Sequence, residues 1–242
     1  MDNVAGSVVD KQSLRDRVWQ ELEHRGVVTF PRPARGRIPN FVGSDLAAAH
    51  LRSLPAYSSA KIIMINPDAA QLPVREFALR DGKQLLMATP RLRRGFIQLD
   101  PKSIHNPRKA ASIKGAFYYG QQVDLKNLKV DLIVEGSVAV DLRGGRIGKG
   151  SGWGDLEYAI LREYEAADEN TPIATTVHDL QMVPPILMTP HDVPVDIIAT
   201  PTQLIFTKSN HPRPSGIKWE ELENSKIREV SILQELKKGK GA

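Results

Sequence analysis

The sequence contains no cysteine, few aromatic residues and no long apolar segment. Among its 242 residues there is no Cys, and Phe, Trp and Tyr together make up 6%. The absence of cysteine excludes disulfides, thiolate nucleophiles, iron–sulfur clusters and cysteine-ligated zinc. No apolar run approaches the ~20 residues that a membrane-spanning helix requires. The first ten residues also lack a charged region followed by an apolar core, so no secretory signal is indicated. We therefore expect a cytoplasmic protein that does not contact a membrane.

The remaining composition is that of a globular protein with a basic surface. Hydrophobic residues make up 41% and charged residues 25%, which is enough for a large core. The net charge of +5 suits a polyanionic partner such as a nucleotide, a polyglutamylated cofactor or a nucleic acid, or it simply aids solubility. Residues 237–241, at the C-terminal end, are expected to form a flexible basic tail. Arginines cluster in two segments: Arg32, Arg35 and Arg37 in the first, and Arg91, Arg93 and Arg94 in the second.

Short apolar segments alternate with helical patterns along most of the chain. The spacing predicts helices at 11–25, 45–54, 73–81 and 155–164, and strands at 61–65, 84–88, 132–134, 138–140, 172–177 and 195–199. Strands that are apolar on both faces and separated by helices are typical of a parallel sheet covered on both sides. We predict one α/β domain over residues 1–242, with a Rossmann-like, mostly parallel sheet and helices on both faces. The prolines of 27–43 exclude regular structure, so this Pro/Arg-rich segment is either a linker or an ordered loop.

Polar residues and turn formers follow several of the predicted strands. They occur at 66–68, 89–91 and 178–179. In sheets of this class the ligand lies outside the carboxyl ends of the strands. The fold class therefore predicts a ligand site that involves these segments.

The most informative segment lies between residues 141 and 155. Glycine occurs at 144, 145, 148, 150, 152 and 154, interleaved with Arg146 and Lys149. Glycines let the backbone present successive N–H groups to an anion, and the helix that follows adds the positive end of its dipole. Neither the Walker A motif nor the dinucleotide fingerprint fits, because Gly150 stands where a hydroxyl is needed and Trp153 where a glycine is needed. The alternative is a flexible surface loop. The cations, and an Asp155 placed to hold a divalent metal, favour a phosphate site.

A second pair of cations occurs in the first predicted helix. Lys11 and Arg15 are four residues apart and so share one face of that helix. Such a pair is usually a solvated face, but beside the ligand edge of a sheet it could clamp a triphosphate.

Taken together, these motifs resemble the 5-formyltetrahydrofolate cyclo-ligase family, also called methenyltetrahydrofolate synthetases. The similar segments are Lys11-x-x-x-Arg15, the loop 146–155, and the segments 178–181 and 190–196. Segments 30–33, 37–41, 66–68, 89–93 and 150–157 are most similar to the divergent methenyltetrahydrofolate synthetase domain-containing branch. Too little chain follows Pro201 for the RNA recognition motif of that branch's vertebrate members, so a stand-alone catalytic-type domain is expected.

The resemblance implies a ribose-isomerase/CoA-transferase-like fold and a specific reaction. ATP and Mg²⁺ would convert 5-formyltetrahydrofolate into 5,10-methenyltetrahydrofolate through a phosphorylated formyl group. The matching positions would be catalytic at Arg146 and Lys149, and would hold Mg²⁺ at Asp155 and Asp192. The ATP-binding residues would be Lys11, Arg15, Arg146, Gly148, Lys149, Gly150, Ser151, Gly152 and Trp153. The candidates for substrate binding are Asp68, Arg75, Trp153 and His178.

The departures from the family pattern fall on the folate side. Trp153-Gly154 replaces a pair of tyrosines, Asp68 replaces a Glu and His178 replaces a Phe. Two alternatives to the folate reaction therefore stay open. One is a paralogue that uses the same ATP site on a non-folate substrate, for example a thiamin-related one. The other is a non-catalytic protein that binds nucleotide or RNA, although nucleic acid is the less favoured partner.

Overall fold

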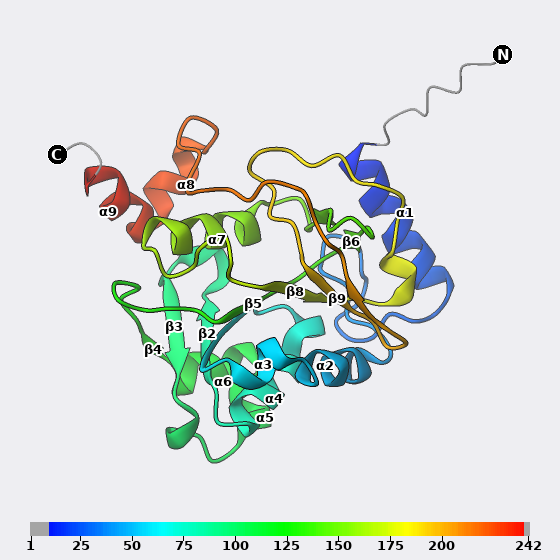
Figure 1. Cartoon of the computed structure of the whole chain (residues 1–242), viewed down its shortest axis with the longest axis horizontal. Coiled ribbons are helices and arrows are strands. Elements are labelled where there is room, and N and C mark those ends of the chain that lie inside the picture. Colours follow the sequence, from blue (N-terminus) through cyan, green and yellow to red (C-terminus); the bar gives the residue numbers. More distant parts are fainter. Residues whose placement is uncertain (1–9, 240–242) are drawn as a thin grey trace.

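A twisted eight-stranded sheet forms the centre of the molecule in the computed structural model, which describes residues 10–239 (Figure 1). The strand order is β10-β9-β8-β5-β1-β2-β3-β4, and the five inner strands β9, β8, β5, β1 and β2 are parallel. The outer strands β3, β4 and β10 pair antiparallel. The strands are β1 (Ile62–Ile65), β2 (Gln84–Ala88), β3 (Phe96–Leu99), β4 (Gln121–Gln122), β5 (Leu132–Glu135), β8 (Ile173–Thr176), β9 (Ile197–Ala199) and β10 (Leu204–Phe206). The predicted α/β class with a mostly parallel sheet is confirmed.

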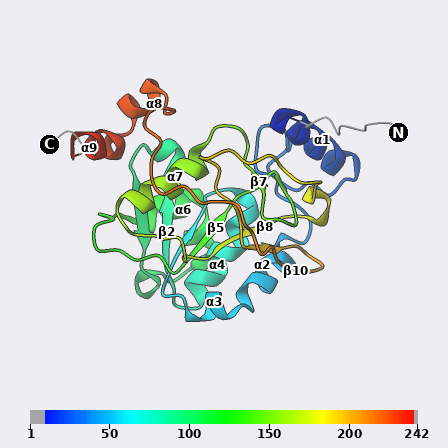
Figure 2. The ribbon, with the colours of Figure 1, turned by 45° about the horizontal axis from the view of Figure 1, so that its top comes forward.

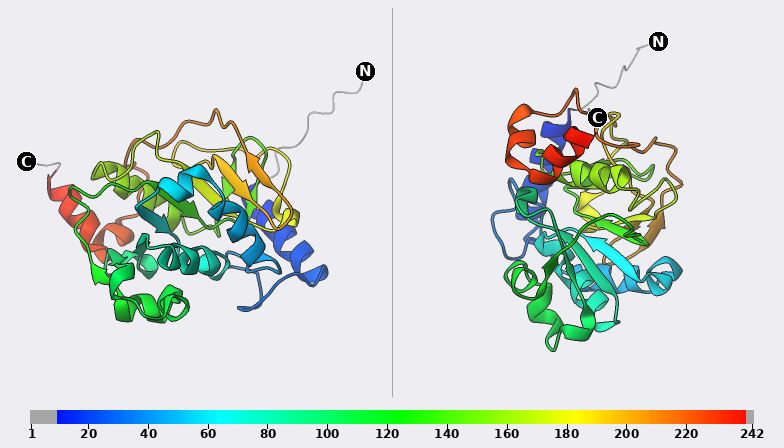
Figure 3. Two further views of the ribbon diagram at one scale, coloured as in Figure 1. Left: turned by 60° about the horizontal axis from the view of Figure 1, so that its bottom comes forward. Right: turned by 90° about the vertical axis from the view of Figure 1, so that its left-hand side faces the viewer.

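Helices cover both faces of this sheet. One face carries α2 (Ser44–Arg52), α3 (Pro55–Ser59), α4 (Leu72–Arg80), α5 (Pro107–Ala111) and α6 (Ile113–Tyr119). The other carries α7 (Trp153–Glu163), α8 (Asn224–Glu229) and α9 (Ser231–Gly239), which lie together in both views of Figure 3. Side chains alternate along each strand, so Ile63 and Ile65 pack toward α2 and α4 while Met64 packs toward α7. Burial on both faces explains why these strands are apolar throughout.

The N-terminal helix α1 (Lys11–His24) lies at the opposite end of the molecule from α9 (Figure 2). Its N-cap is Asp10, whose side chain accepts hydrogen bonds from the backbone N–H groups of Gln12 and Ser13. Its apolar face packs against the small hairpin of β6 (Ala139–Val140) and β7 (Arg146–Ile147) and against the Pro/Arg-rich segment. Ala34, Ile38 and Phe41 of that segment are buried, so it is an ordered loop rather than a linker.

Several details differ from the predictions. Helix α7 begins at Trp153 rather than at residue 155, because Gly152 adopts a left-handed conformation (φ 65°) that serves as its N-cap. The expected flexible tail is wrong for residues 237–239, which continue α9, while residues 240 and 241 lie outside the described part. The sequence analysis also missed α3, α5, α6, α8, α9, β3, β4, β7 and β10. Among the described residues there are also four short 3-10 turns: Ala69–Gln71, Pro90–Leu92, Pro101–Ser103 and Asp179–Gln181.

The order of the strands sets the position of the site. From β1 the chain builds outward to β2 on one side, whereas β5, β8 and β9 add on the other. The carboxyl ends of β1 and β5 therefore flank the point where the topology switches, which is where open α/β sheets bind ligands. Residues 66–68 follow β1 at this point and residues 136–137 follow β5. Within residues 10–239, no helix has the length and apolar character needed to cross a membrane.

Candidate functional site

A cleft of about 470 Å³ opens at this switch point. Its floor comes from the ends of β1 and β5. One wall consists of the first turn of α7 and of the glycine loop, which we define as residues 148–152. The predicted site residues that line this cleft are Asp68, Arg146, Gly148, Lys149, Ser151, Gly152, Trp153 and Asp155. Residues scattered from 68 to 155 in the sequence thus meet in one place.

A second cavity, of about 260 Å³, lies on the other side of the glycine loop. Gly150, Ser151, Gly152 and Asp155 line it from the loop side. Its remaining walls are the flank of α7 and the segment 214–226. We call it the C-terminal cavity. The glycine loop is therefore a partition between two spaces rather than the rim of one.

The backbone N–H groups of the glycine loop are not used by the fold. Within the described residues, no hydrogen bond is donated by the N–H groups of residues 148–152. Their carbonyls are engaged, since Gly148 O accepts from Arg15 Nε at 2.7 Å and Ser151 O accepts from Lys226 Nζ at 3.0 Å. The loop is thus held by its acceptors while its donors are free. This arrangement suits an anion with several oxygens.

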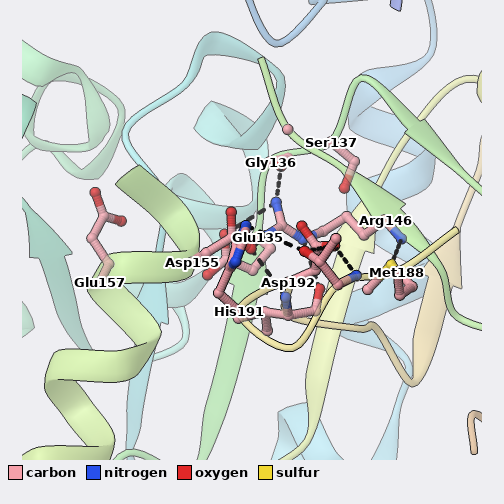
Figure 4. Close-up of polar contacts among 12 residues, drawn as sticks. Glu135, Gly136, Ser137, Arg146, Asp155, Glu157, Met188, His191 and Asp192 are labelled. Carbon is pink, nitrogen blue, oxygen red and sulfur yellow. Dashed lines mark hydrogen bonds and ion pairs between the residues drawn. The ribbon is translucent and has the colours of Figure 1, made fainter. Parts of the chain in front are cut away.

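Arg146 is buried beneath this loop, where a Cβ at Gly148 would be 3.4 Å from its Nη1. Figure 4 shows its side chain beside Asp155 and Gly136. Its guanidinium donates to Val193 O at 3.0 Å and to Gly136 O at 3.2 Å, and it is paired with Asp155. Burial lowers its pKa, but the charges of Asp155 and Glu135 outweigh burial and raise it, so the group stays cationic. The structure gives Arg146 a framework role under the loop. Its predicted catalytic role stays a prediction.

Lys149 is the loop cation that reaches the cleft. Its side chain is 37% exposed, and Nζ donates to Asp68 Oδ1 at 3.1 Å. The pair spans the cleft from the glycine loop to the segment after β1. An ammonium held by one partly exposed carboxylate can release it to bind a phosphate.

Lys11 and Arg15, both on α1, reach the opposite side of the glycine loop. Lys11 pairs with Asp192, and Arg15 lies so close to the loop that a Cβ at Gly150 would be 3.5 Å from its guanidinium carbon. Burial lowers the pKa of Arg15 while the nearby carboxylate of Asp192 opposes this shift. Arg15 therefore meets the loop at Gly148, 133 residues away in sequence, and Lys11 meets Asp192, 181 residues away.

Asp155 and Asp192 are joined through the backbone of Val193, whose N–H donates to Asp155 Oδ1 at 3.0 Å. Burial raises the pKa of Asp192, but hydrogen bonds from Lys11 and Thr189 outweigh burial and lower it, so the group is ionised. Within the described residues, no hydrogen bond reaches Oδ2 of Asp155 or Oδ1 of Asp192. Nor do residues 10–239 hold a cluster of three or more His, Asp or Glu placed to bind a metal. Two carboxylates with free oxygens, completed by phosphate, are the donor set that Mg²⁺ prefers.

Two glutamates that the sequence analysis gave no role also line the cleft. Glu135 is completely buried, and within the described residues neither of its carboxyl oxygens has a hydrogen-bond partner. Burial raises the pKa of Glu135 to about 7, although Arg146, 3.9 Å away, opposes this shift. Burial, followed by the charge of Glu135, raises the pKa of Glu157, which accepts from Asn66 Nδ2 at 2.9 Å. The sequence signal that could have identified Glu135 was a charged residue at the end of the apolar strand 132–134.

Arg75 and His178 lie outside the residues that line the cleft. The guanidinium of Arg75 is buried and donates to the carbonyls of Asn66, Asp68 and Ala111. The ring of His178 caps the turn after β8 by accepting from the N–H of Leu180 at 3.1 Å. Burial lowers the pKa of His178, so the neutral ring that this acceptor role requires is favoured. Both side chains support segments of the site from behind.

Comparisons with known proteins agree with this geometry. A model of the 5-formyltetrahydrofolate cyclo-ligase family matches residues 7–201. The chain belongs to this family. The resemblance inferred from the glycine loop and the Lys11/Arg15 pair is therefore confirmed.

Similarity to individual proteins points to the divergent branch. The chain is 42% identical over 238 residues to a methenyltetrahydrofolate synthase domain-containing protein of Bos taurus, and 40% identical to that of Homo sapiens. Each alignment covers 95% of this chain but 62% of the relative, so this cyclo-ligase family member spans under two thirds of those proteins. The NMR structure of 5,10-methenyltetrahydrofolate synthetase from Aquifex aeolicus superposes with a TM-score of 0.50 at 19% identity, over 88% of this chain and 99% of that one. At that identity the likeness shows the shared fold.

Proposed function

We propose that this chain is an ATP-dependent cyclo-ligase that converts 5-formyltetrahydrofolate into 5,10-methenyltetrahydrofolate. The proposal rests mainly on one observation, the row of unpaired N–H groups at residues 148–152. Lys149 stands on one side of this row and Arg15 on the other. Backbone donors and cations arranged in this way match the charge of a triphosphate.

The residues of the chain fit a transfer that depends on position and charge. The formyl oxygen attacks the γ-phosphorus and ADP leaves, and this step requires no base because that oxygen carries no proton. The second nitrogen of the folate then attacks the activated carbon and loses its proton, while the formyl oxygen departs with phosphate. Lys149 and the loop N–H groups would stabilise the charge that spreads over the transferring group.

The metal would be held at the far end of the loop. Asp155 and Asp192 would supply one free oxygen each, and Lys11 and Arg146 keep these two carboxylates in place. Mg²⁺, when bound there, shields the charge of the phosphates.

The cleft is the proposed place for the substrate that receives the phosphate. Asp68, Glu135 and Glu157 line it and can accept hydrogen bonds from the N–H groups of a ligand, while burial raises the pKa values of the two glutamates and so keeps their negative charge low near neutral pH. A pterin ring carries such donors along one edge. The same acidic floor favours a second candidate, an ATP-dependent reaction on another N–H-bearing heterocycle such as an aminopyrimidine.

The reaction can be followed by the ultraviolet absorbance of the methenyl product. Purified protein is incubated with 5-formyltetrahydrofolate, ATP and Mg²⁺, and product should form only when all three are present. Lys149→Ala should lower kcat/KM about 100-fold, since it removes one charge-stabilising donor from the transferring group. The control is Lys126→Ala, which alters an exposed lysine far from the cleft.

The outcomes separate the two candidates. Product that depends on Lys149 supports the folate reaction. ATP binding without product from 5-formyltetrahydrofolate would favour the non-folate substrate. Failure to bind ATP at all would refute both, and salt-sensitive RNA binding by the same protein would point to a binding role.

A further inference from the structure

The C-terminal segment, which we define as residues 213–230, is not part of the matched family region, residues 7–201. The curated relatives align over 95% of the chain, so their similarity continues into this segment. In the structure the segment crosses α7 and returns to the glycine loop (Figures 1 and 3). It is therefore an addition that touches the site.

Both ends of the segment are anchored. Arg213 is paired with Asp196 and donates to the carbonyls of Glu169 and Thr171 at 2.7 and 2.8 Å. At the other end, Val230 is fully buried in the core beneath α7. A segment fixed in this way offers a preformed surface rather than a loose strap.

Between its anchors the segment forms one wall of the C-terminal cavity. The apolar side chains of Pro214, Ile217 and Leu222 face Leu156 and Ala159 of α7 across the space. A volume of about 260 Å³ is smaller than the ~300–1,000 Å³ of pockets that hold whole drug-sized ligands. It is the size for one planar heterocycle between two apolar walls.

The cavity also borders the free N–H groups of the loop. Gly150, Ser151 and Gly152 line it, and its polar rim carries Lys226. The Lys226 ammonium donates to Ser151 O at 3.0 Å and lies 5.4 Å from the centre of the Trp153 ring. Lys226 thus ties the C-terminal segment to the end of the phosphate-binding row that leads into α7.

We propose that the C-terminal segment completes the nucleotide site, with the C-terminal cavity holding the base of the nucleotide whose phosphates lie on the glycine loop. Lys226 is then a positioning residue that fixes the loop carbonyls and leaves the N–H groups free. The inference rests on the proposed function, because it takes ATP as the ligand of the loop. It adds that the base binds on the face of the loop opposite the cleft, between the apolar side chains of α7 and those of the C-terminal segment.

Equilibrium binding of ATP and of inorganic tripolyphosphate, each with Mg²⁺, separates the base from the phosphates. The wild-type protein should bind ATP about 10- to 100-fold more tightly than tripolyphosphate, since the heterocycle is removed from water. Leu222→Trp fills the cavity and should abolish most of this preference, with tripolyphosphate binding changed less than about twofold. The matched control is Glu223→Trp, which places the same side chain at the exposed neighbouring position.

Lys226 is tested by the same two ligands. Lys226→Ala should weaken ATP and tripolyphosphate alike by about fivefold, because the loop loses its anchor, and it should raise the KM for ATP more than it lowers kcat. Lys226→Arg should restore both, and Arg228→Ala, an exposed cation on the same helix, should change neither. If Lys226 only stabilised the fold, Lys226→Ala would lower the melting temperature without raising the KM for ATP more than it lowers kcat.

Each result has one meaning. If the wild-type protein binds tripolyphosphate and ATP equally well, the base is not bound and the inference fails while the proposed function stands. If neither ligand binds, the proposed function itself fails. If Leu222→Trp and Glu223→Trp retain the same preference for ATP, the base lies elsewhere.

Discussion

The two spaces on either side of the glycine loop differ in charge and in origin. The cleft is built from the ends of β1 and β5 and carries the acidic side chains of Asp68, Glu135 and Glu157. The C-terminal cavity is built from α7 and the C-terminal segment; its walls are apolar, and its charged residues, among them Asp155, Glu221 and Lys226, are of both signs. Arg15 approaches the loop from α1, where it donates to Gly148 O and lies close to Gly150. The partition separates a side that encloses two buried glutamates from a side with apolar walls.

Under the proposed function, this difference suits different ligands on the two sides. The carboxyl oxygens of the cleft suit the N–H groups of a substrate, whereas the free N–H groups of the loop and the cations beside it suit phosphates. Two cations at the loop differ in a comparable way. Arg146, beneath the loop, donates to two backbone carbonyls and pairs with Asp155, whereas Lys149, within the loop, has one partly exposed partner. The first supports the partition, and the second is available to a ligand.

The largest expected effect tests this contrast between the two loop cations. Arg146→Ala leaves the buried carboxyl of Glu135 and the partly buried carboxyl of Asp155 without their counter-charge, and should lower the free energy of unfolding by about 3–5 kcal/mol. Lys149→Ala should lower it by less than about 1 kcal/mol. Urea unfolding of both variants measures the difference. Adding Glu135→Gln to Arg146→Ala should recover part of the loss, and equal losses in the two single variants would remove the distinction.

A smaller effect concerns the pH dependence of the cleft. The folded-state pKa of Glu135 is raised from 4.5 to about 7, so the folded protein holds this proton more tightly than the unfolded chain. The resulting stability is fully present below about pH 4.5 and is lost as the pH rises toward 7. Relative to Glu135→Gln, the wild-type free energy of unfolding should fall by about 3 kcal/mol across that interval. Glu220→Gln removes an exposed carboxyl, and its free energy of unfolding should follow that of the wild type at every pH. If the difference in free energy of unfolding between the wild type and Glu135→Gln does not change with pH, the pKa of Glu135 is the same in the folded and unfolded states and the prediction is wrong.

The smallest effect tests the proposed position of the phosphates beside Arg15. Arg15→Ala removes the donor to Gly148 O and one cation near the phosphates, and should raise the KM for ATP about tenfold while kcat changes less. Arg17→Ala changes an exposed arginine on the same helix and serves as the matched control. Steady-state kinetics at varied ATP measure both. Equal KM values for the two variants would place the triphosphate away from α1.

The predictions that succeeded rested on local patterns. The apolar segments gave the inner strands of the sheet, with β2 at its observed bounds, because burial on both faces imposes a continuous apolar run. The outer strands β3, β4 and β10 were not predicted, because strands near the edge of a sheet carry a weaker apolar pattern. Of these, β4 is exposed and β10 is partly exposed. The C-terminal helices were not predicted for a related reason. Their few apolar residues show no clear pattern in the sequence, and their role is visible only once they pack in the same core cluster as α7.

The sequence by itself determined the fold class and the family, and it predicted the segment proposed to bind an anion, because glycine spacing and apolar periodicity are local properties of the chain. Only the tertiary structure decided which charges are free. Arg146 meets Val193 and Gly136, Glu135 is enclosed beneath Gly154, and Lys226 arrives from 75 residues beyond Ser151. The protonation and availability of a charged group depend on its burial and partners, and those partners come from parts of the chain that only folding brings together.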